Sequence, residues 1–194
     1  MIKPDFTAQR HAWSRDINEV VYTTRINRRG DVVGVMRVNF TPHGFLVLAG
    51  SDQIILLENF TGANGVNDNA TTIVGAQNDA EMMHAEPAVW TLDPITKRFI
   101  KKIVAPGPRS FVFGINSFGD QLAMLSDPVG VQDNFFKAHG SDAFVQLQRL
   151  IPPESGVLDR SQVTKPFLDD RRQIAGCGPS AHDHNRTHAW VLQL

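Results

Sequence analysis

The sequence predicts an all-β protein, a four-bladed β-propeller-like ring of about four-stranded repeats. Three observations lead to this prediction. A hairpin motif returns four times along the 194 residues, each copy is followed by a strand-like apolar segment, and sustained helical periodicity is nearly absent. A repeat of this kind indicates architecture, because it devotes its residues to turns and packing.

The hairpin motif is an aliphatic residue, an Asn or Asp, a short polar turn, and an aliphatic run usually closed by Gly. Its first copy is Ile26 to Gly34, and the others span residues 66–75, 115–123 and 168–176. The Asn or Asp can form an Asx-turn, and a Gly three residues later can take the left-handed conformation that closes a tight loop. Ala70 and Arg172 stand at that Gly position in the second and fourth copies, so we expect those two turns to deviate.

Two further elements follow the hairpin. A short apolar segment is found at 43–46, 87–90, 142–145 and 188–191, and a third strand-like segment at 53–57 and 97–104. The motif Asn or Asp residues stand at 27, 67, 116 and 169, a spacing of 40 to 53 residues that suits a propeller blade. The predicted division is one domain, 1–194, with units 15–60, 61–108, 109–158 and 159–194. In the third unit, Asp127 to Ser141 is predicted to be an insertion.

The two ends of the chain predict how the ring closes. The fourth unit stops at Leu194 after its third strand, whereas residues 6–14 contain a strand-like segment with no hairpin before it. Pairing these ends would complete the last blade and cover an edge that otherwise invites aggregation.

The apolar positions that recur from unit to unit are the predicted core. They are Ile26, Val33, Phe45, Val74, Trp90, Ile115, Leu122, Phe144, Ile174 and Trp190.

These motifs resemble a known family. The pairing of I-N-x-x-G-x-V-V-G with a His-Ala-aromatic segment resembles the HAF repeat, found in bacterial, mostly extracellular β-repeat proteins. The last third is most similar, with 150–156, the hairpin at 168–176 and His188 to Leu192 in the family's order. The resemblance implies a β-repeat architecture and carries no catalytic residues with it.

Composition narrows the function classes. A formal net charge of −1 gives no electrostatic reason to expect nucleic-acid or membrane-surface binding. The single cysteine, Cys177, excludes an intramolecular disulfide. Residues 1–9 contain no apolar core of a signal peptide. The compartment stays open, because the resemblance suggests an extracellular protein, whereas this N-terminus suggests a cytoplasmic one or a chain without its leader.

The densest group of chemically capable side chains is His182, His184 and His188. Imidazoles at this spacing could bind zinc or a similar divalent metal, the one cofactor the sequence suggests. The alternative is a solvated loop between strands, with His188 filling a structural repeat position. Cys177 could pair with these histidines as a nucleophile, or it could be a small residue at a strand end. A G-x-S-x-G elbow, a Walker loop and a G-x-G-x-x-G motif are all absent from the sequence.

The function predicted from the sequence is a non-catalytic binding module for an unknown protein, small molecule or glycan. The irregular loops 82–86, 129–141 and 178–187 are its candidate recognition surface. The arginine pairs at 28–29 and 171–172 fall on equivalent hairpin tips, which would form a basic spot if the ring closes; the default interpretation is that they are solvated turn residues. The alternative function is a metal-dependent hydrolase that uses the three histidines named above.

Overall fold

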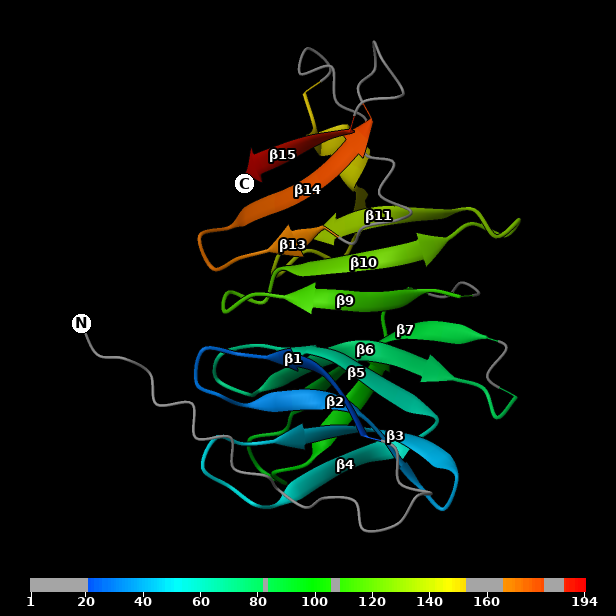
Figure 1. Ribbon diagram of the computed structural model, residues 1–194, viewed down its shortest axis with the longest axis vertical. Coiled ribbons are helices and arrows are strands. Elements are labelled where there is room, and N and C mark those ends of the chain that lie inside the picture. Colours follow the sequence, from blue (N-terminus) through cyan, green and yellow to red (C-terminus); the bar gives the residue numbers. More distant parts are fainter. Residues whose placement is uncertain (1–20, 82–83, 106–108, 153–165, 180–186) are drawn as a thin grey trace, which may run out of the picture.

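The computed structural model describes residues 21–81, 84–105, 109–152, 166–179 and 187–194. These residues form four antiparallel sheets, three of four strands and one of three (Figure 1). The all-β prediction is therefore confirmed. Within these described ranges, no helix is long and apolar enough to cross a membrane.

The strands follow one another in chain order within each sheet, so that each sheet is a simple meander. The first sheet contains β1 (Val21–Ile26), β2 (Val32–Val38), β3 (Thr41–Val47) and β4 (Ile54–Asn59). The second contains β5 (Thr61–Val66), β6 (Thr72–Asn78), β7 (Ala85–Leu92) and β8 (Phe99–Ile103). The third contains β9 (Phe111–Ile115), β10 (Gln121–Ser126), β11 (Gln132–Lys137) and β12 (Val145–Gln146), which leads into the 3-10 helix η1 (Leu147–Leu150). The fourth contains β13 (Phe167–Leu168), β14 (Gln173–Pro179) and β15 (Thr187–Gln193).

The hairpin motif forms the turn between the first and second strand of every sheet. Asn27 Oδ1 accepts hydrogen bonds from the backbone N–H groups of Arg29 (3.0 Å) and Asp31 (2.8 Å). Equivalent pairs of bonds close the turns that begin at Asn116 and Asp169. In the second turn, Asn67 Oδ1 accepts instead from the backbone N–H groups of Thr71 and Thr72. The predicted Asx-turn, a side-chain bond to the backbone N–H two residues on, is confirmed in the first, third and fourth copies. The side chain of Asn67 also closes its turn, but at the fourth and fifth residues after it.

The fourth turn does not deviate, contrary to the prediction from its sequence. Arg172 has a φ of 59° and Ala70 a φ of 54°, in the same left-handed region as Gly30 and Gly119, both at 90°. The Asx hydrogen bonds therefore impose the conformation even where a side chain makes it costly. The second turn does differ in length, since Asn67 N–H bonds to the carbonyl of Thr72, one residue further along than in the other turns.

The first strand of each of the first three sheets contains a bulge. At the bulges in β1 and β5, a polar side chain reaches the first strand of the next sheet. Thr24 Oγ1 donates a hydrogen bond to the carbonyl of Ala63, and Asn64 Nδ2 donates one to the carbonyl of Val112 at 3.0 Å. The bulged backbone also needs a Gly opposite it on the second strand. A Cβ added at Gly75 would lie 1.8 Å from the carbonyl oxygen of Gly62.

The third sheet corrects the prediction of an insertion at 127–141. Asp127 forms another Asx-turn, accepting hydrogen bonds from Val129 (3.0 Å) and Val131 (2.8 Å), and the chain continues directly into β11. Phe136 of β11 is buried in the core. The segment at 142–145, expected to be a full strand, contributes to the two-residue β12, and η1 buries Leu147 in its place.

Three apolar clusters join neighbouring sheets. One lies between the first and second sheets, one between the second and third, and one between the third and fourth. Eight of the ten predicted core residues are buried. Phe144 is only half-buried, and the prediction for Ile26 is wrong, because its side chain is 64% exposed at the end of β1. Ile26 lines a small cavity where the four motif turns meet.

Candidate functional site

The structure leaves the predicted histidine cluster undecided. His182 and His184 lie outside the described residues, and His188 lies in β15 with its side chain also outside them. Cys177 is half-buried in β14, opposite Ala189. Within the described ranges no three His, Cys, Asp or Glu side chains gather as a metal would require. Two other places have the polar groups or the open volume of a site.

The first place is the turn cluster, formed by the four motif turns. Asn27 Nδ2 donates hydrogen bonds to Asp31 Oδ2 at 2.8 Å and to the carbonyl of Asn67, in the second sheet, at 3.0 Å. Asn116 Nδ2 makes the equivalent bonds in the third sheet, to Asp120 Oδ2 at 3.0 Å and to the carbonyl of Asp169, in the fourth sheet, at 3.3 Å. Each of these amides therefore closes its own turn and ties that turn to the next sheet.

The turn cluster also connects the first and fourth sheets. Arg28 Nε lies 2.9 Å from Asp170 Oδ2 and 4.0 Å from Asp68 Oδ2. The guanidinium of Arg25 lies over the ring of Phe167, 4.5 Å from its centroid. The turns of all four sheets thus surround one cavity of about 240 Å³.

Two of the four arginines at these tips meet acids. Arg28 pairs with Asp170 as described above, and Arg172 Nε lies 2.8 Å from Asp120 Oδ2. Asp120 is fully buried, and burial alone would raise its pKa. The hydrogen bonds from the backbone N–H of His139, from Asn116 and from Arg172, together with the charge of Arg172, outweigh burial and hold the pKa of Asp120 below its ordinary value. The turn cluster is therefore a largely self-compensated structural network.

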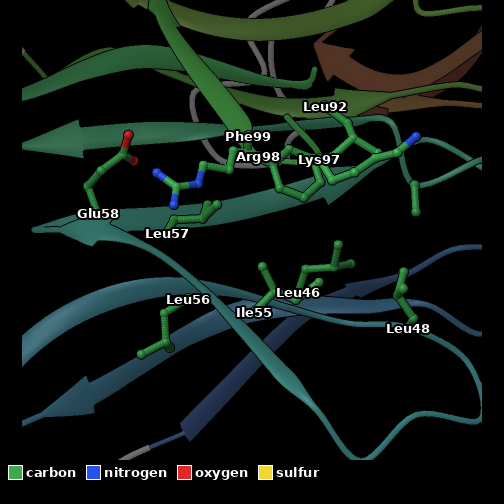
Figure 2. A pocket seen from close by; sticks show the side chains of 11 residues that line it. Leu46, Leu48, Ile55, Leu56, Leu57, Glu58, Leu92, Lys97, Arg98 and Phe99 are labelled. Atoms are coloured by element: carbon green, nitrogen blue, oxygen red, sulfur yellow. The ribbon is translucent and has the colours of Figure 1, made fainter. Parts of the chain in front are cut away.

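The second place is an open groove between the outer strands of the first and second sheets, with a cavity volume of about 470 Å³. It extends the apolar cluster that joins these sheets, so its floor is continuous with the core. Figure 2 shows side chains from β4 on one side and from the β7–β8 hairpin on the other. We call this feature the lateral groove. Its lining residues are Leu46, Leu48, Ile55, Leu56, Leu57, Glu58, Ala70, Leu92, Lys97, Arg98 and Phe99.

One hydrogen bond spans the two sheets at the groove. Trp90, fully buried on β7, donates its indole N–H to Glu58 Oε2 on β4 at 2.7 Å. A buried indole needs such a partner, so this bond fixes where β4 lies against the second sheet. It also engages the carboxylate of Glu58, the one acidic side chain among the groove-lining residues.

The rim of the groove is basic. Lys97 and Arg98 are both exposed in the β7–β8 hairpin, and neither forms an ion pair or side-chain hydrogen bond with another described residue. Figure 2 places the Arg98 guanidinium toward Glu58 and the Lys97 ammonium at the opposite end of the groove. Asp93, in the same hairpin, is an acid whose pKa the positive charge of Lys97 helps to lower. Hydrogen bonds from the backbone N–H groups of Thr96 and Ile95 lower the pKa of Asp93, so it stays ionised within the hairpin turn.

Sequence reasoning missed the lateral groove, because its two walls come from outer strands of different repeats. The available signal was the segment Lys97 to Ile103, where basic residues flank the apolar pair Phe99 and Ile100. The pattern indicates a strand that carries both apolar and basic residues, but not what that strand lies against. Of the predicted recognition loops, residues 129–141 contain all of β11, and the other two loops lie partly outside the described residues.

Comparison with known proteins gives a likeness of fold. The chain matches no protein-family model and no curated protein. Among solved structures it is similar to TolB from Acinetobacter baumannii, a β-propeller, with 13% sequence identity and a TM-score of 0.50. The match covers 84% of this chain and 40% of the TolB chain, so this chain spans well under half of that protein. The finding places the four sheets among propeller-like all-β folds.

Proposed function

We propose that this protein is a non-catalytic binding module that takes its ligand in the lateral groove. The observation that carries the proposal is the open apolar volume of about 470 Å³ beside the core. Ligand sites are typically concave and apolar, with a few polar groups at defined positions, and cavities of this size are usual for them. The turn cluster is a weaker candidate, since its cavity of about 240 Å³ is surrounded by side chains that bond to one another.

The proposed architecture is a ring of four blades. The contacts of Arg28 with Asp170 and of Arg25 with Phe167 support it, because they join the first sheet to the fourth. In this proposal the segment 6–14 supplies the fourth strand beside β15, and the repeats belong to the HAF-repeat family whose motifs they resemble. The formal charge of −1 supports a ligand other than nucleic acid or a membrane.

A neutral apolar dye such as Nile red tests whether the groove binds apolar ligands. We expect dye fluorescence to rise on binding, and amide chemical-shift changes to concentrate in β4 and β8. Leu48 lines the groove and is 39% exposed, so Leu48→Trp should fill the volume and abolish binding.

The matched control is Val129→Trp, which adds the same indole at an 84% exposed position in the β10–β11 turn. This variant should bind the dye like the parent. Equal binding by Leu48→Trp and the parent, or shift changes that avoid β4 and β8, would refute the groove as the site.

A further inference from the structure

The charge around the lateral groove points to the chemistry of its ligand. Residues 93–102 contain four basic side chains, Lys97, Arg98, Lys101 and Lys102, and one acid, Asp93. The whole chain has a formal net charge of −1, so basic charge is concentrated on this hairpin. A second open volume shares Glu58, Arg98 and Phe99 with the groove and adds Lys101 to its lining.

The two ends of the groove differ electrostatically. At one end Glu58 is held by Trp90 and lies toward Arg98, so an anion approaching Arg98 would also meet a carboxylate. At the other end Lys97 is the only charged residue of the lining, and its neighbour Asp93 is already bonded to backbone N–H groups. An anionic group is therefore favoured at the Lys97 end.

Between these ends the groove offers an apolar path. Leu46 and Leu57 are buried, and Ile55 and Phe99 pack against the same core cluster while lining the groove. An extended hydrocarbon chain would remove this apolar surface from water, which favours binding. A ligand with charges along its length would lose hydration there without gaining partners.

We propose that the lateral groove binds a small anionic amphiphile, with its acyl-like chain along Ile55 and Phe99 and its carboxylate, sulfate or phosphate at Lys97. This inference rests on the proposed function, because it specifies the ligand of the same groove. An exposed charge contact of this kind contributes modestly, whereas the apolar chain supplies most of the affinity.

The experiment compares dodecanoate with dodecyltrimethylammonium, which has the same chain and the opposite charge, by calorimetry below their micelle concentrations. We expect dodecanoate to bind at least about fivefold more tightly, and the difference to shrink as salt is raised. Lys97→Gln should remove most of the preference. The matched control Lys102→Gln makes the same charge change on an exposed residue that lines neither volume, and should retain it.

The outcomes separate the two proposals. Equal affinities for the two head groups, or a preference lost equally in Lys97→Gln and Lys102→Gln, would overturn the anionic assignment. Nile red binding would in that case still support the groove as an apolar site. Sulfate shifting the Lys97 amide without dodecanoate binding would also overturn it, because the apolar chain would then play no part. Failure of both Nile red and dodecanoate to bind would instead refute the proposed function.

Discussion

At the scale of single residues, the fold depends on buried polar groups that each have several partners. Asp120 is fully buried and bonds to the backbone N–H of His139, to Asn116 and to Arg172. Asp31 makes the equivalent bonds in the first sheet, to Asn27 and to the backbone N–H of Ala49. In both sheets one carboxylate connects the first turn to the second residue after the third strand.

Asp120 predicts a dependence of stability on pH. Its folded pKa lies below its unfolded value of about 3.9, so its contribution is full above that pH and is lost as the pH falls through the folded pKa. We expect Asp120→Asn to lower the free energy of unfolding by roughly 2 kcal/mol at pH 7. Urea unfolding of both proteins from pH 7 to pH 3 should show the difference shrinking as the pH falls. A difference independent of pH would contradict this role.

Gly75 gives a second prediction at this scale. The Cβ of Gly75→Ala would lie 1.8 Å from the carbonyl oxygen of Gly62 and 3.2 Å from the Cα of Ala63, both backbone atoms that cannot move cheaply. We expect a loss of about 1–3 kcal/mol, measured by urea unfolding. Gly62→Ala is the control, because its Cβ would meet only Val35 Cγ2 at an ordinary 3.5 Å. The prediction fails if the two substitutions cost the same.

At the scale of the element, the motif turn depends on an amide that both accepts and donates. Asn116 accepts from Phe118 and Asp120 and donates to Asp120 Oδ2 and to the carbonyl of Asp169. Asn116→Asp keeps the acceptor but places two carboxylates together in a buried site. We expect it to cost about 2–4 kcal/mol at pH 7, measured by thermal or urea unfolding.

The fourth turn supplies the control for this substitution. Asp169 acts there as an acceptor for Arg171 and Gln173, so Asp169→Asn retains both bonds and should change stability by no more than about 0.5 kcal/mol. A similar loss in both variants would show that the amide donors of Asn116 contribute little.

Most of the fold could be predicted at this element scale, since the hairpin turns depend on local residues. The Asn and Asp of the motif locate every first turn, and alternating apolar residues locate the strands. The role of Asp127 was missed because Asp-Pro-Val-Gly matches the motif in hydrogen bonding but lacks its flanking aliphatic pattern. The exposure of Ile26 and the lateral groove could not be predicted, because both depend on how separate sheets lie against each other.

At the scale of the whole molecule, the sheets are joined in two different ways. Apolar clusters join successive sheets, whereas Arg28 and Asp170 and the stacked Arg25 and Phe167 join the first to the last. The proposed ring would add a strand from residues 6–14 beside β15.

The most direct test of the ring is the melting temperature of a chain that lacks residues 1–14, compared with the full chain. If these residues complete the fourth blade, their loss exposes the edge of β15 and should lower the melting temperature by about 6 °C or more. Sedimentation of both chains should show the truncated one dimerising through that edge. A truncated chain that melts at the same temperature and stays monomeric would contradict the ring.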